Sequence, residues 1–397
     1  MFPDYSHFKR AALAFIVLAI TPAPLSADEL KLTPGLSVQE EYNDNIFLVS
    51  GNKQSDFITT LTPSLEFSSR TEQHAASISG GVNWLSYVRY TEFDSVDFFG
   101  HGAFSYQRDP QLAFSVGADY IKNSQGQIGA VTGLAINSGS DIQSYQASGS
   151  YAVTEKSQVS LGYTYSQEDF DNPSYLSTRE HRATAGLGYT LVPGTTLEEA
   201  FSFDRQLTDI SQVDNYSATI SLKRKFKELW SLYLNAGGRY TRSVFSETGV
   251  PDSTNTNWGF VGGLAFNYSG EKMSSSVSFN HNVVLAPGFA GSTQMTGGSA
   301  TLGNQFTREF FGNVGFGYFL NKSTQGQFSV QPVDETTLAL NCLLRYDLTY
   351  VLKLNAKNKL ALEANYNFTN IEYNYNGTHA SQNVIMLRLL MRHMLFL

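Results

Sequence analysis

The sequence is built from stretches of 10–15 residues in which apolar and polar side chains alternate, separated by turn-forming residues. In one of them Val159, Leu161 and Tyr163 point one way, and the small polar residues between them point the other. A period of two indicates β-strands, because successive side chains leave opposite faces. Strands of soluble domains usually have about 5–6 residues, whereas roughly 9–11 tilted residues cross a bilayer. Length and alternation together predict a membrane-spanning β-barrel with an apolar exterior and a polar interior.

Some eighteen such stretches follow one another along the chain. They cover residues 31–42, 56–69, 74–90, 95–108, 111–123, 141–154, 157–169, 179–192, 195–207, 213–226, 230–245, 255–269, 273–285, 293–307, 310–322, 335–349, 359–373 and 380–397. Short turns alternate with longer polar links, as in outer-membrane barrels. Three joins depart from this alternation: 91–94 and 208–212 are short for outer loops, and 350–358 is long for an inner turn. The predicted fold is all-β, an antiparallel transmembrane barrel of outer-membrane type with about 18 strands, and 16 strands is the alternative.

Composition agrees with a barrel and excludes other classes. Aromatic residues make up 13% of the chain, yet charged residues reach only 16% and mean hydropathy is −0.21. A barrel accounts for this balance, because its apolar side chains face lipid while Ser, Thr, Asn and Gly face inward. After the N-terminus no run approaches 18 consecutive apolar residues, which excludes ordinary transmembrane helices. The formal net charge of −8 argues against a nucleic-acid partner. The expected partners are outer-membrane lipid and the barrel-assembly machinery.

The N-terminus has the pattern of a secretory signal. Lys9 and Arg10 precede the apolar stretch Ala11–Ile20, prolines break it, and Ala27 offers a small residue for cleavage. We therefore expect residues 1–27 to be a cleaved signal peptide and residues 28–397 to be the barrel. After export by this route, we expect the mature barrel to lie in the outer membrane.

The alternation also predicts which charged side chains line the pore. A charge that faces lipid at mid-depth costs about 2–4 kcal/mol, so strand charges are expected to point inward. The predicted pore-lining residues are Arg89, Arg182, Asp204, Arg239, Arg345, Asp347, Glu363, Arg388 and Arg392. The arginines could set a preference for anions or bind acidic sugars. Alternatively, they pair with Asp204, Asp347 and Glu363 to hold the wall together.

A segment that begins at Gly35 carries a distinctive motif, Tyr42-Asn43-Asp44-Asn45-Ile46-Phe47, followed by Asp56-Phe57. Over about 35 residues it resembles the opening of a family of outer-membrane β-barrel porins. Members of this family are often encoded beside genes for exopolysaccharide synthesis and export. The resemblance implies a barrel porin and suggests polysaccharide export components as partners.

Three functions remain open. The first is a porin or channel that passes small polar solutes or assists exopolysaccharide export. The second is a non-conducting accessory barrel that docks a periplasmic export partner. The third is a lipid-modifying hydrolase, suggested only by the pattern His379-Ala380-Ser381. The substrate and the oligomeric state stay open.

No cofactor or metal site is predicted. The histidines are not paired at ligand spacing with another ligand. The oxygen-rich group Asn43, Asp44, Asn45 and Asp56 could bind Ca²⁺, but a solvated loop explains these turn-forming residues better.

Overall fold

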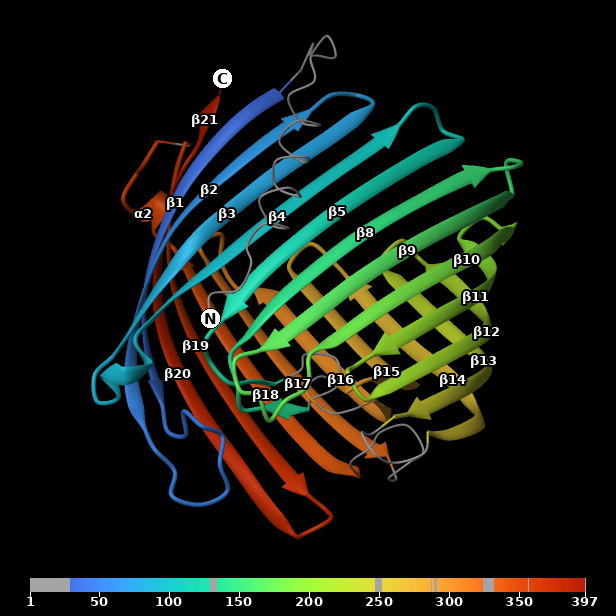
Figure 1. Cartoon of the computed structure of the whole chain (residues 1–397). Coiled ribbons are helices and arrows are strands. Elements are labelled where there is room, and N and C mark those ends of the chain that lie inside the picture. The colour runs from blue at the N-terminus through green and yellow to red at the C-terminus, as the bar shows by residue number, and fades with distance from the viewer. Residues whose placement is uncertain are drawn as a thin grey trace, which may run out of the picture.

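The computed structural model describes residues 29–128, 134–246, 252–286, 288, 291–323, 332–355 and 357–396. Within them, eighteen long antiparallel strands form one closed ring, in which β1 pairs with both β2 and β20 (Figure 1). The strands are β1 (Glu29–Asn43), β2 (Asp56–Arg70), β3 (His74–Tyr87), β4 (Ser95–Gln107), β5 (Leu112–Asn123), β8 (Ser140–Ala152), β9 (Ser157–Phe170), β10 (Thr178–Val192), β11 (Thr195–Leu207), β12 (Ser211–Phe226), β13 (Trp230–Phe245), β14 (Ser253–Ser269), β15 (Met273–Leu285), β16 (Ser292–Gln305), β17 (Phe310–Ser323), β18 (Val333–Asp347), β19 (Asn358–Tyr373) and β20 (Thr378–His393).

The all-β prediction and the count of eighteen strands are confirmed, and the alternative of sixteen is wrong. The three unusual joins have local explanations. The first contains the 3-10 helix η1 (Thr91–Phe93), and the second is a tight turn in which the Thr208 amide donates to the Ser211 carbonyl at 2.9 Å. The third contains the short helix α2 (Leu348–Val351). The last predicted strand is interrupted after β20 and resumes as β21 (Leu395–Phe396), which pairs with the start of β1.

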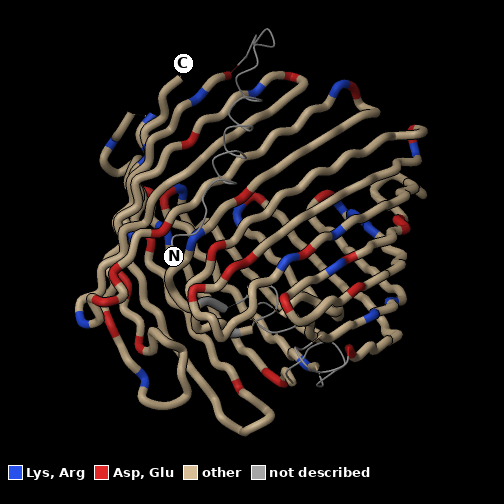
Figure 2. The backbone as a smooth tube through the Cα atoms, viewed as in Figure 1, with Lys and Arg blue, Asp and Glu red and all other residues tan. Residues whose placement is uncertain are grey.

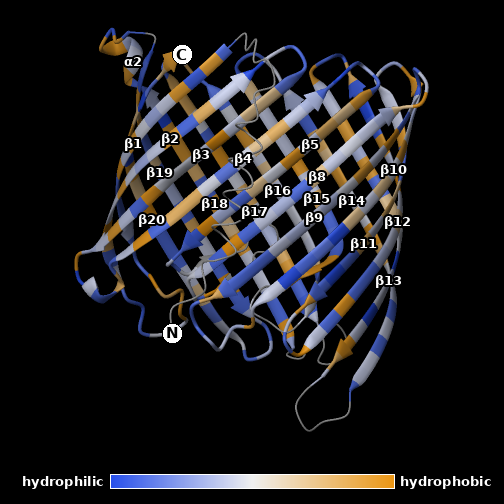
Figure 3. Cartoon of the chain, turned by 45° about the horizontal axis from the view of Figure 1, so that its top comes forward, coloured by the Kyte–Doolittle hydropathy of each residue, from blue (hydrophilic) through white to orange (hydrophobic). Residues whose placement is uncertain are grey.

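The exterior of the ring is apolar. Leu161, Phe201, Ile220 and Trp258 are 62%, 64%, 57% and 79% exposed, respectively. Figure 3 shows hydrophobic and hydrophilic residues alternating along the strands. A continuous apolar surface of this kind is energetically favourable in contact with lipid hydrocarbon and unfavourable in contact with water.

The two ends of the barrel differ. The rim that contains the start of β1 and the end of β20 has short turns, and we call it the turn rim. The opposite rim carries the longer connections, and we call it the loop rim. In outer-membrane barrels the short turns are periplasmic and the longer loops extracellular. Four of the connections at the loop rim are named L1 (44–55), L3 (124–139), L4 (171–177) and L7 (286–291). L3 contains a small separate hairpin of β6 (Gln127–Ile128) and β7 (Ala135–Ile136).

Among the described residues, no helix combines the length and apolar character needed to span a membrane. The predicted signal peptide, residues 1–27, lies outside the described residues.

Candidate functional site

The bore is the candidate site, and alternation decides which side chains reach it. Arg182, Asp204, Arg239, Glu363 and Arg388 occupy the strand face opposite to the exposed apolar side chains. They come from strands on different sides of the ring, and Figure 2 shows charged positions distributed along the strands as well as at the turns.

Arg345, Glu363 and Arg388 form one cluster. Glu363 lies opposite Arg345 in the β18–β19 pairing and opposite Arg388 in the β19–β20 pairing. Its carboxylate is 8% exposed and accepts from Arg388 Nε at 2.9 Å, while Arg345 Nη1 lies 3.7 Å away. Both guanidiniums are about two-fifths exposed. Because two cations share one carboxylate, the cluster holds the wall and still presents an excess positive charge to the bore.

Arg182 and Asp204 belong to a second network. Arg182 Nη2 lies 2.6 Å from a Glu180 carboxylate oxygen and 3.4 Å from Asp204 Oδ2. Gln206 donates to the same Asp204 oxygen at 3.2 Å and accepts from the Ser292 hydroxyl at the end of L7. The sequence analysis missed Glu180 and Gln206. Their spacing of two residues from Arg182 and Asp204 is the signal that would have found them.

Arg239 is almost fully buried, at 2% exposure. Its guanidinium donates to the Thr241 hydroxyl, which in turn donates to Asn215 Oδ1 at 2.6 Å. The same guanidinium lies against Gly259 on β14, where it leaves no space for a Cβ atom. The glycine therefore makes room for the arginine inside the wall.

The other predicted pore-lining residues lie apart from these clusters. Arg89 follows the end of β3, and its guanidinium contacts Ser55 at the loop rim. Asp347 accepts from the Thr349 amide at 2.9 Å and caps α2 at the turn rim. Arg392 lies one residue before the end of β20, opposite Lys359.

The family motif closes the seam of the barrel. Beyond the last β1–β20 pair, Asp44 accepts from the Asn383 amide nitrogen and from Asn383 Nδ2, both at 2.7 Å. Asn45 is fully buried, and its side chain donates to the carbonyls of Val49 and Ser381 at 2.8 and 2.9 Å. We call these contacts the seam clasp. They tie L1 to the C-terminal strand, so the motif residues have a structural role here.

The remaining motif residues order the strand ends beside the clasp. Asn43 Oδ1 accepts from the Asn45 amide at 3.0 Å, and the rings of Tyr42 and Phe57 pack 5.0 Å apart on the outer face. The Asp56 carboxylate is 1% exposed and accepts from three backbone amides, those of Phe57, Arg89 and Tyr90. These carboxylates are satisfied by amide hydrogens, and no group of three metal-ligating side chains occurs in the described residues.

L3 crosses the mouth of the bore, which the sequence analysis did not predict. Its first residue, Ser124, donates its amide to Asp97 at 3.1 Å. Farther along, Leu134 is completely buried in a cluster with Ala286 of L7 and Val333 of β18. In the ring β18 lies far from β5 and β8, which flank L3. The described residues of L3 therefore reach from one wall to the far one.

L4 joins this arrangement. Leu176 forms a β-bridge with Gly288 of L7, and the Asn137 amide of L3 donates to the Tyr175 hydroxyl at 3.1 Å. L3, L4 and L7 are thus interlocked over the loop rim. The sequence signal for L3 is a set of apolar residues in this long link, including Ile128, Val131, Leu134 and Ile136.

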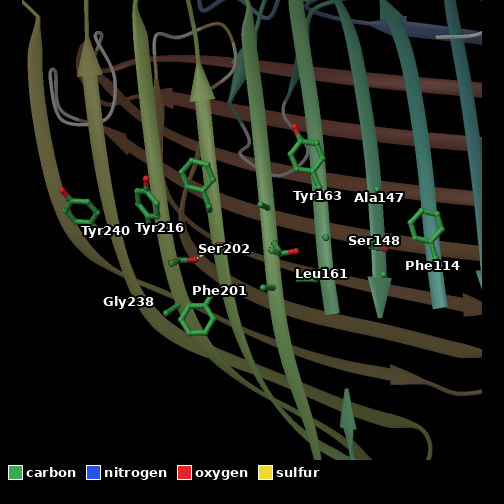
Figure 4. Close-up of a pocket in the computed structure, with 18 of the residues that line it drawn as sticks. Phe114, Ala147, Ser148, Leu161, Tyr163, Phe201, Ser202, Tyr216, Gly238 and Tyr240 are labelled. Carbon is green, nitrogen blue, oxygen red and sulfur yellow. Dashed lines mark hydrogen bonds between the residues drawn. The ribbon is translucent and has the colours of Figure 1, made fainter. Parts of the chain in front are cut away.

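The outer wall has a hollow of about 1050 Å³ that extends from β5 to β14 (Figure 4). Small residues such as Ala147, Ala185 and Gly238 line it together with larger ones such as Leu161 and Tyr240. It belongs to the lipid-facing surface and carries no titratable side chain except tyrosine.

The hydrolase pattern has a structural explanation. The Ser381 hydroxyl accepts from Lys53 Nζ at 2.6 Å, and its carbonyl belongs to the seam clasp. This places Ser381 in the packing between L1 and β20.

Comparison with known proteins gives a family for the N-terminal quarter. A family model described as "Putative beta-barrel porin 2" matches residues 30–126, which confirms the porin resemblance over this segment. No curated protein matches.

Similar solved structures include three outer-membrane porins. Acinetobacter baumannii OccAB4 is 11% identical (TM-score 0.49), with 94% of this chain and 100% of that chain covered. Pseudomonas aeruginosa OccK2 (OpdF) is 10% identical (TM-score 0.49; 94% and 99% covered). Pseudomonas aeruginosa OpdK with vanillate is 11% identical (TM-score 0.48; 94% and 100% covered).

Proposed function

We propose, from the match of residues 30–126 to a β-barrel porin family, that this protein is an outer-membrane channel for small polar solutes. The observation that carries the proposal is the charged inner face of a closed ring of eighteen described strands. Barrels of 16–18 strands enclose a bore wide enough for water, whereas small barrels are filled by their own side chains. The interlocked L3, L4 and L7 narrow the mouth, which favours small solutes over a polymer.

Planar-bilayer recording tests this proposal. Purified, folded protein is expected to produce discrete conductance steps, because each inserted barrel adds one water-filled path. The same detergent without protein, and protein unfolded by heat before insertion, serve as controls. A folded barrel that inserts and stays silent would contradict the channel.

A second candidate is favoured by the contacts among L3, L4 and L7 at the loop rim. In this proposal the barrel does not conduct and instead assists exopolysaccharide export, docked to a periplasmic export component. The family resemblance at Tyr42–Phe57 supports it. Deleting the gene separates the two: lost solute uptake with normal secreted polysaccharide supports the channel, and the reverse supports the accessory role.

A further inference from the structure

The inner charges of the bore are sorted by depth. We propose that the bore has an acidic zone at the loop rim and a basic zone at the turn rim, and therefore conducts ions better in one direction of voltage. This inference rests on the proposed channel function. It adds a selectivity mechanism and the residues that carry it.

The acidic zone includes five inner-facing carboxylates from five strands. Each lies within three residues of the loop end of its strand: Glu41, Asp97, Glu168, Asp204 and Glu335. Within the described strands, the inner-facing cations of this half are Arg182 and Arg239. Arg182 is already shared by Glu180 and Asp204. Acids therefore outnumber bases around the mouth.

The basic zone lies at the other end. It includes six inner-facing cations, each within five residues of the turn rim: Lys223, Lys225, Arg345, Lys359, Arg388 and Arg392. Lys31, which pairs with Glu29, and Arg70 have the same inward position near this rim. Acids also occur there, and most of them are engaged; Glu66 of β2 is an inner-facing acid of the described strands for which no ion pair is present. Glu198 pairs with Lys223, and Glu363 is shared by two arginines.

Three of the six named cations have no such partner. Among the described residues, no carboxylate lies within 4.0 Å of Lys225, Lys359 or Arg392. Lys359 and Arg392 lie directly opposite each other in the β19–β20 pairing. Like charges in directly opposed positions repel each other. A mobile anion from solution relieves this repulsion, so anions are expected to gather at the turn rim.

Opposite fixed charges at the two ends make conduction depend on the sign of the voltage. Cations are enriched in the acidic zone and anions in the basic zone. When the loop side is positive, the field drives both kinds of ion toward the middle of the bore, and the current rises. When the loop side is negative, both are drawn out of the middle, and the current falls. The effect requires weak screening, which extends about 10 Å at 0.1 M salt and about 3 Å at 1 M.

The test is current–voltage recording with known orientation. Ser174→Cys in L4, in a Cys342→Ala background, marks the loop side by its reaction with a membrane-impermeant thiol reagent added to one chamber. At about 0.1 M KCl the current with the loop side positive is expected to exceed the reverse current by roughly twofold. At about 1 M KCl the ratio is expected to approach one.

The variant Lys225→Gln/Lys359→Gln is expected to bring the ratio close to one at low salt. The matched control Lys156→Gln/Lys272→Gln removes two lysines from the turns and none from the bore. Its current ratio is expected to equal that of the wild type. If the wild-type barrel conducts equally in both directions, or conducts better with the loop side negative, the proposal of two charge zones is wrong and the channel function is still supported. Absence of any conductance overturns both.

Discussion

Replacing Leu134 by aspartate is expected to raise the single-channel conductance by about threefold. Leu134 is completely buried against Ala286 and Val333, and this apolar contact holds L3 to the far wall. An unpaired carboxylate in such a place loses its hydration without gaining a partner, which costs several kcal/mol. L3 would leave the far wall while its base stays attached through Ser124 and Asp97. The measurement is single-channel recording at high salt, where the zone charges are screened.

Asn137→Asp is the matched control. It adds the same charge to the same loop at an exposed position, so its conductance is expected to match the wild type. If Leu134→Asp folds and conducts like this control, L3 does not limit the current.

Replacing Asp44 by alanine is expected to loosen the seam of the barrel. Two hydrogen bonds from Asn383 to the Asp44 carboxylate would be lost. Bonds to a charged group contribute about 1.5–3 kcal/mol each, so a loss of about 3 kcal/mol is expected at this rim. The unfolding temperature, followed by the loss of β-sheet circular dichroism in detergent, should fall by several degrees.

The control for this variant is Asp209→Ala, which removes an exposed carboxylate from another turn of the loop rim. It should unfold at the wild-type temperature. Equal unfolding temperatures for the two variants would show that the seam clasp does not stabilise the barrel.

The strands could be predicted because their causes are local. Alternation indicates which face of the sheet each side chain occupies, and turn residues indicate where each strand ends. For β13 and β15 the predicted bounds are the observed ones. Arg89 shows the limit of this reasoning. The periodic pattern extends to Tyr90, but β3 ends at Tyr87, where the Asp94 carboxylate accepts the backbone amide. Asp56, far away in the sequence, accepts the amide of Arg89 in the same way. Side-chain acceptors therefore replace strand pairing after Tyr87.

The candidate site was only partly predictable for the same reason. Inward positions for Glu363 and Arg388 follow from alternation, but their meeting depends on the strand register, which turn geometry sets. Asp347 has the inward parity, yet it caps α2, a helix that the apolar join did not suggest. The contact of Leu134 with Ala286 and Val333 joins residues more than a hundred positions apart. Nothing in the local pattern encodes it.

A lipid-embedded barrel with a water-filled bore requires neighbouring residues of one strand to face hydrocarbon and water in turn. Phe201 is 64% exposed on the outer face, while the next residue, Ser202, bonds to Ser217 inside at 2.6 Å between hydroxyl oxygens. The decisive measurement is thiol labelling of Phe201→Cys and Ser202→Cys, each in a Cys342→Ala background, in lipid vesicles with a small water-soluble reagent. Rapid labelling at 202 with protection at 201 is the predicted result. Equal labelling at both positions, or protection of 202 alone, would contradict a water-filled bore enclosed by a lipid-facing wall.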